Sequence, residues 1–234
     1  MADWKCTWLG HATFLLHTPG QRKVVIDPWL EGNPRCPQEY YGLPECDLIL
    51  VTHGHFDHIA SAADLARRTG ATVVANFEIA AYLEGQGVQH TVGMNQGGTW
   101  QQDRLDVTMV HAEHSSGIST EEGLQYGGDA AGFVVTLENG YSLYHAGDTN
   151  VFGDMRLIHD LYAPDLALLP IGGHFTMGPK EAAYAVRLLA PKVVIPMHYG
   201  TFPALTGTPA ALRDLLQETG VRVVELAPGE SWTQ

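Results

Sequence analysis

Histidine and aspartate are concentrated in one short run of the chain, Thr52-His53-Gly54-His55-Phe56-Asp57-His58. Imidazoles and carboxylates are the ligands that zinc and other first-row divalent ions prefer in proteins. Gly54 allows the backbone to turn sharply between two of these ligands. Because one small ion cannot use all the ligands of this turn, the run predicts a metal centre that recruits further ligands from elsewhere.

Three later segments carry polar residues that could complete such a centre, and each follows an apolar stretch. The candidates are His111, Glu113 and His114, then His145 and Asp148, then His198. His111 and His114 are three residues apart, so they face opposite sides of a strand and compete for one role. A single His or Asp at a strand end is usually structural or solvated, but all three segments together favour a metal centre.

Regular elements are expected directly around these polar segments. The apolar run 48–52 indicates a strand buried on both faces, and residues 58–68 have helical spacing that stops at Gly70. Asn139-Gly140 predicts a hairpin between strands 132–137 and 141–144. Strands at 165–171 and 192–196 flank a helix at 180–189. The pattern predicts an α/β fold with two sheets packed face to face and helices outside.

Composition narrows the class of protein further. The chain has 234 residues, of which 45% are hydrophobic, and no linker divides it, so we expect a single domain over 1–234. No membrane-spanning run and no signal peptide are recognised, so a cytoplasmic location is expected. The net charge of −13 disfavours a long nucleic acid and favours a small-molecule substrate. Three cysteines without a CxxC indicate free thiols, and a homo-oligomer is compatible with the sequence.

The sequence resembles the metallo-β-lactamase superfamily, and within it a family of metal-dependent hydrolases related to ascorbate-phosphate lactonases. The resemblance is carried by the run at 53–58, His-Ser-Ser at 114–116, Gly-Asp-Thr at 147–149 and Pro-Met-His-Tyr-Gly-Thr at 196–201. The stretches at 8–11 and 169–178 extend it over nearly the whole chain.

This resemblance implies a four-layer αβ/βα sandwich with two divalent ions, zinc first and manganese or iron as alternatives. His114 is preferred to His111 because Ser115 and Ser116 follow it, as in the family. The implied ligands are His53, His55 and His114 for the first ion, Asp57, His58 and His198 for the second, and Asp148 as a bridge between them.

The implied activity is hydrolysis of a small ester, lactone or phosphoester by a hydroxide held between two metal ions. Asp57 would orient this nucleophile, and His174 would protonate the leaving group. His174 and Thr176 share a loop that the resemblance places at the cleft mouth, and His11 is expected to line the same cleft. These three residues are therefore the candidates for substrate binding.

Three other functions are weighed against this one. A phosphodiesterase or small-RNA nuclease on the same scaffold usually carries an extra nucleic-acid-binding domain. A di-iron oxygen- or nitric-oxide-reducing module usually has an acidic residue where this chain has His55 and is fused to a flavin domain. A metal-dependent binding protein without turnover is the third alternative.

Overall fold

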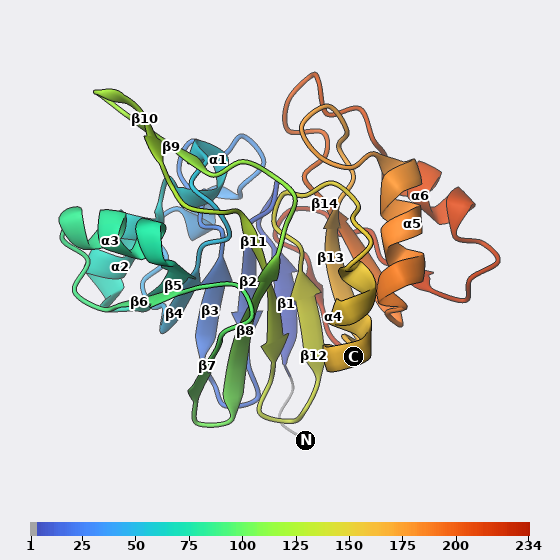
Figure 1. Ribbon diagram of the computed structural model, residues 1–234, viewed down its shortest axis with the longest axis horizontal. Coiled ribbons are helices and arrows are strands. Elements are labelled where there is room, and N and C mark those ends of the chain that lie inside the picture. The colour runs from blue at the N-terminus through green and yellow to red at the C-terminus, as the bar shows by residue number, and fades with distance from the viewer. Residues whose placement is uncertain (1–3) are drawn as a thin grey trace. The chain divides into compact units, whose positions relative to one another are not determined.

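The computed structural model describes residues 4–234, which fall into two compact units (Figure 1). Unit 1 comprises Met1–Gln96, Ser115–Ala130 and Leu226–Gln234, and unit 2 comprises Gly97–His114 and Ala131–Glu225. Each unit contains one mixed sheet with helices beside it, so the predicted α/β class is confirmed. The single domain expected over 1–234 stays a prediction.

The sheet of unit 1 has the strand order β16-β1-β2-β3-β4-β5-β6. Neighbours from β16 to β3 pair antiparallel, and those from β3 to β6 pair parallel. A separate hairpin, β9 and β10, belongs to the same unit. The bounds are β1 Lys5–Trp8, β2 Phe14–His17, β3 Lys23–Ile26, β4 Leu48–Leu50, β5 Thr72–Asn76, β6 Thr91–Met94, β9 Gly117–Thr120, β10 Gly123–Tyr126 and β16 Ser231–Trp232.

The helices of unit 1 differ from the expectation at one place. The single helix expected over 58–68 is two helices, α1 (Phe56–Ile59) and α2 (Ala62–Thr69). The break has a physical cause, because the Ser61 amide donates to Pro28 O at 2.8 Å rather than continuing the α1 hydrogen-bond ladder. The short 3-10 helix η1 (Gln38–Tyr40) and α3 (Phe77–Gly85) complete the unit.

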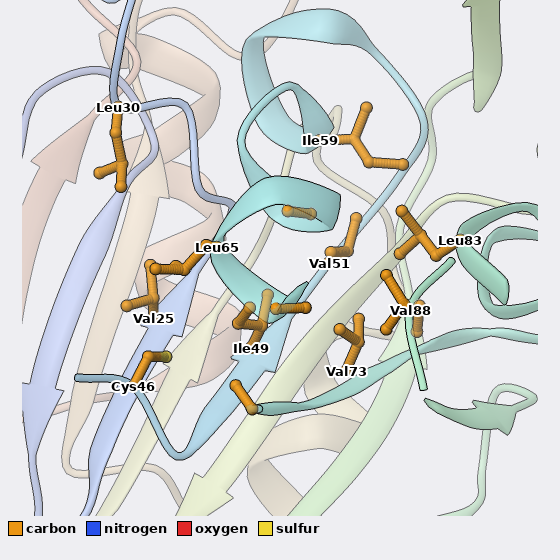
Figure 2. Packing of buried hydrophobic residues seen from close by; sticks show 14 of the residues in the cluster. Val25, Leu30, Cys46, Ile49, Val51, Ile59, Leu65, Val73, Leu83 and Val88 are labelled. Atoms are coloured by element: carbon orange, nitrogen blue, oxygen red, sulfur yellow. The ribbon is translucent and has the colours of Figure 1, made fainter. Parts of the chain in front are cut away.

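The core of unit 1 lies between its parallel strands and two of its helices (Figure 2). Val25, Ile49 and Val73 come from adjacent strands β3, β4 and β5, and each has 0% of its surface exposed. Leu65 of α2 and Leu83 of α3 pack against them. Burying one such aliphatic side chain contributes about 1.5–3 kcal/mol. This packing makes the end of β4 a rigid support for the residues that follow it.

The sheet of unit 2 has the order β15-β14-β13-β12-β11-β8-β7. Neighbours from β7 to β12 pair antiparallel, and those from β12 to β15 pair parallel, which repeats the pattern of the first sheet. The predicted Asn-Gly hairpin is confirmed as β11 and β12. The bounds are β7 Thr99–Gln102, β8 Leu105–His111, β11 Ala131–Thr136, β12 Ser142–His145, β13 Leu166–Pro170, β14 Val193–Met197 and β15 Arg222–Val223.

Three helices accompany this second sheet, α4 (Met155–Tyr162), α5 (Pro179–Leu189) and α6 (Pro209–Leu215). Helix α5 confirms the predicted helix at 180–189, while α4 was not anticipated from the sequence. Pro begins both α5 and α6, where its missing amide proton costs no helical hydrogen bond. Between residues 4 and 234, no helix combines the length and apolar character needed to span a membrane. Cys6, Cys36 and Cys46 are free thiols, and all three are buried.

Candidate metal centre

The run at 53–58 lies beyond the carboxyl end of β4 and continues into α1. Strand β4 belongs to the parallel part of the first sheet, so a buried strand supports the start of this run. Gly54 is required there, because a Cβ at this position would lie 2.6 Å from Ile118 Cγ1 and 3.3 Å from Ser116 O. The Gly54 amide donates to Ser116 Oγ at 3.1 Å, and Ser116 Oγ donates to Gly127 O at 2.8 Å. The segment at 115–127 therefore fixes the backbone that carries the histidines.

Two imidazoles of this run point their ring nitrogens at each other. His53 Nε2 and His55 Nδ1 are 3.0 Å apart, and the Oγ of Ser115 lies 3.2 Å from His55 Nε2. His53 is fully buried, while His55 is only partly buried. Two converging imidazole nitrogens form part of a ligand set for a divalent ion.

A second group in unit 1 is formed by Asp57, His58 and His11. Their candidate ligand atoms lie within 4.8 Å of one another. Asp57 is 9% exposed, and His58 and His11 are fully buried. His11 was expected to line a substrate cleft, but its Nε2 lies 2.9 Å from Asp57 Oδ2. The structure thus connects His11 to a predicted ligand, and its substrate role stays a prediction.

Asp27, which the sequence analysis missed, links these two groups. Its Oδ2 lies 2.7 Å from His58 Nδ1 and accepts a 2.7 Å hydrogen bond from Thr52 Oγ1. Thr52 Oγ1 in turn lies 3.0 Å from His53 Nδ1. The Nδ1 protons of both rings therefore point into the Asp27 network, which leaves each Nε2 as the nitrogen that can bind an ion.

A signal for Asp27 was present in the sequence. It is the acidic residue that directly follows the apolar strand β3 and precedes Pro28. The position resembles that of the polar residues after β4, but a lone aspartate at a strand end is a common feature. Its backbone φ of 48° and its complete burial distinguish it only in the folded chain.

Unit 2 contains three of the predicted ligands, and two of them, both histidines, lie near one carboxylate oxygen of the third, Asp148. Asp148 Oδ2 lies 3.0 Å from His198 Nε2 and 3.6 Å from His114 Nε2. Asp148 follows β12 and His198 follows β14, and these strands run parallel through β13, so their carboxyl ends share one sheet edge. Asp148 is 2% exposed and His198 is 1% exposed.

Hydrogen bonds between loops hold this arrangement in place. The Glu113 amide donates to Thr149 Oγ1 at 3.0 Å, which joins the segment before His114 to the segment after Asp148. His145 is fully buried, and its Nδ1 accepts from the Gly147 amide at 3.1 Å. His145 therefore shapes the turn that presents Asp148.

The remaining candidates lie on the surface of unit 2. His111 and Glu113 are exposed, and the His111 ring packs on Phe152 with 4.9 Å between centroids. His174 is exposed and packs on Phe175 at 4.4 Å, and Thr176 is half-buried in the same loop. The Met177 amide donates to Thr149 O at 3.2 Å, which ties this loop to the segment after Asp148. The substrate roles of His174 and Thr176 stay predictions.

The donor set fits divalent cations. Asp27, Asp57 and Asp148 are carboxylates with at most 9% of their surface exposed. Burying a carboxylate is costly unless it is paired or coordinates a metal. Here each buried carboxylate lies beside imidazoles, and this combination of nitrogen and oxygen donors suits zinc, manganese or iron.

Comparisons with known proteins agree with this chemistry. Residues 22–199 match the family described as the beta-lactamase superfamily domain. The chain is 53% identical over 229 residues to a UPF0173 metal-dependent hydrolase of Rubrobacter xylanophilus, covering 97% of this chain and 95% of the relative. It is 48% identical over 229 residues to one of Koribacter versatilis, covering 98% and 97%.

A solved structure supports the same assignment. A metallo hydrolase of the hyperthermophilic archaeon Ignicoccus hospitalis has a TM-score of 0.87 and 36% identity, covering 99% of this chain and 98% of the other. The predicted fold and the resemblance to metal-dependent hydrolases are confirmed. The chain therefore belongs to the UPF0173 metal-dependent hydrolases of the beta-lactamase superfamily and has the metallo-β-lactamase fold.

Proposed function

We propose that this hydrolase uses two divalent ions, zinc in the first instance, to cleave a small ester, lactone or phosphoester. His53, His55 and His114 would hold one ion, and Asp57, His58 and His198 the other. Asp148 would bind both. Two such cations supply a nucleophile from water near neutral pH and polarise the bond under attack.

One observation carries this proposal. A single oxygen, Asp148 Oδ2, lies near Nε2 of both His114 and His198, at 3.6 Å and 3.0 Å. The proposal assigns these two histidines to different ions, and a carboxylate oxygen near both is suited to a bridging role. A bridge explains why one buried carboxylate is shared by two imidazoles from different segments of the chain.

The protein residues have separate tasks in this reaction. Asp57 accepts a hydrogen bond from the attacking water and orients it towards the substrate. His174 delivers a proton to the leaving group from an exposed loop. Thr176, in the same loop, contacts the substrate. The net charge of −13 favours a small molecule over a long nucleic acid as the substrate.

Metal stoichiometry provides the first test. Protein purified without chelators is expected to contain about two ions per chain by elemental analysis. His198→Ala should lose mainly one ion, because the three histidines assigned to the other are untouched. A wild-type protein that saturates at one ion would contradict the binuclear centre, and so would equal loss of both ions from folded His198→Ala.

Substrate class requires a separate experiment. Protein reconstituted with zinc, manganese or iron is assayed on a panel of esters, lactones, phosphomonoesters and phosphodiesters. We expect turnover of at least one small substrate by the wild-type protein and no turnover by Asp148→Ala. Asp160→Ala should keep the activity, because it is a matched control at an exposed carboxylate paired with Arg156. Absence of turnover on the whole panel with both ions bound would favour a binding protein.

A further inference from the structure

His11 is buried against the run that carries the predicted metal ligands. It follows β1 and precedes β2, 46 residues before Asp57, yet its Nε2 lies 2.9 Å from Asp57 Oδ2. Its ring makes edge contacts with Trp29 at 5.2 Å and His58 at 5.8 Å between centroids. None of its surface is exposed. These neighbours hold the imidazole in one orientation towards Asp57.

The backbone around His11 adopts an unfavourable conformation that delivers this orientation. His11 has a φ of 56°, in the left-handed region that side chains rarely enter. Trp8 Nε1 donates to His11 O at 2.9 Å, and the Thr13 amide donates to Gly10 O at 3.0 Å. Gly10 itself has a φ of 94°, and a Cβ there would lie 2.7 Å from Arg35 Cβ. Strained backbone of this kind is concentrated at functional sites.

We propose that His11 is a positioning residue for Asp57. The inference rests on the proposed function, in which Asp57 binds an ion and orients water. The His11 Nε2–H donates to Asp57 Oδ2, which fixes the rotation of the carboxylate and leaves Oδ1 to face the ion. Partners of this kind orient metal ligands, and their loss typically lowers metal affinity about 10–100-fold.

Two other roles for His11 make different demands. A structural histidine needs only a hydrogen-bond partner, as half-buried His159 finds in Leu189 O at 3.0 Å. A metal ligand must turn a ring nitrogen to the ion. Nε2 faces Asp57 Oδ2 at 2.9 Å, a distance at which it can donate its proton. A ring nitrogen that donates this proton has no lone pair left for an ion, so the hydrogen bond and coordination exclude each other, and metal binding by His11 variants distinguishes them.

The test compares variants that differ in the donor at the Nε2 position. His11→Gln keeps an N–H donor at similar reach, His11→Asn carries the same amide on a shorter side chain, and His11→Leu removes the donor at similar volume. His159→Leu is the matched control at a histidine away from the predicted ligands. Each protein is titrated with Co²⁺, and the visible absorption of the bound ion reports both affinity and coordination. The same titration of Asp57→Ala shows which of the two ions binds more weakly when Asp57 is absent.

We expect His11→Leu to lower the affinity for the ion that depends on Asp57 about 10–100-fold. His11→Gln should bind this ion with an affinity within about threefold of wild type and with the wild-type Co²⁺ spectrum. The other ion should be unaffected, and His159→Leu should behave as wild type. Equal affinity in His11→Leu and wild type would overturn the positioning role. A changed spectrum and loss of the ion in His11→Gln would overturn it in favour of a direct ligand.

Folding is checked by circular dichroism of the metal-free proteins. If His11→Leu does not fold, His11→Gln and His11→Asn decide, because they share one functional group and differ in reach. Weaker binding in His11→Asn than in His11→Gln supports the inference, and equal binding contradicts it. The titration needs no turnover, so a protein that hydrolyses nothing on the substrate panel would contradict the proposed function while leaving this result interpretable.

Discussion

Asp27 Oδ2 lies 2.7 Å from His58 Nδ1, and neither side chain has any exposed surface. The same carboxylate receives the Thr52 amide on its other oxygen, Oδ1, at 2.8 Å. Asp27 therefore sets both the tautomer of His58 and the position of the segment that begins at Thr52. The residues proposed to bind an ion are held by a carboxylate that is not itself among the proposed ligands.

Asp27→Asn should therefore weaken metal binding although the variant is nearly isosteric. The amide oxygen can still accept from the Thr52 amide, but the amide nitrogen cannot accept the proton of His58 Nδ1. We expect about 10–100-fold lower affinity for the ion that is assigned to His58 in the proposed centre. Isothermal titration of the metal-free protein measures it. Asp64→Asn, at an exposed carboxylate paired with Arg68, is the control, and equal affinity in Asp27→Asn and this control would disprove the role.

Asp148→Ala should abolish turnover more completely than His58→Ala. Asp148 Oδ2 lies near Nε2 of both His114 and His198, so in the proposed binuclear centre its removal would change the separation of the two ions and their charge balance together. In the same proposal His58→Ala removes a ligand of one ion only. We expect kcat/KM to fall at least about tenfold further in Asp148→Ala, which corresponds to about 1.4 kcal/mol of transition-state stabilisation. Comparable residual activity in the two variants would count against the bridge.

His174→Ala should keep its full metal content and its stability. The side chain is exposed and packs on Phe175, so its loss leaves the core intact. We expect kcat to fall about 10²–10⁴-fold if the imidazolium donates a proton to the leaving group. Metal content and kcat are measured on one preparation, with exposed His90→Ala as control. A near-normal kcat would remove His174 from the reaction.

The buried thiols should react slowly with a thiol reagent while the protein is folded. Burial raises the pKa of Cys36 and of Cys46 to about 12, against the usual 9.0, and raises the pKa of Cys6 as well. The thiolate is the reactive form, so at pH 8 its fraction should be about 10³-fold lower than in the denatured chain. Stopped-flow labelling with and without guanidinium compares the two states. Rapid labelling of one thiol in the folded protein would show local opening there.

The raised pKa values of these thiols also give them a contribution to the free energy of unfolding that depends on pH. The thiols bind protons more tightly in the folded chain, so their contribution is fully present below the unfolded pKa near 9.0 and is lost as pH rises towards 12. Below pH 8 these groups should leave the free energy of unfolding unchanged.

The run at 53–58 could be recognised from the sequence because its chemistry is local. His53, His55, Asp57 and His58 come from one turn, so their side chains stay close whatever the rest of the chain does. Strand ends were recognisable for a similar reason, since apolar runs such as 48–50 predict buried strands by themselves. The family followed from these motifs in their order along the chain.

Only the tertiary structure decided which side chains orient the predicted ligands. Asp27 meets His58 across 31 residues, His11 meets Asp57 across 46, and Ser116 meets Gly54 across 62. Such contacts depend on how strands pair and where loops return, which no local pattern encodes. His11, Asp27 and His198 also have positive φ angles, a conformation that Asp and His adopt more often than most residues but that residue type alone does not predict. Local spacing therefore determined the ligand types, whereas long-range packing determined their partners and orientation, because a hydrogen bond needs a distance that only the folded chain sets.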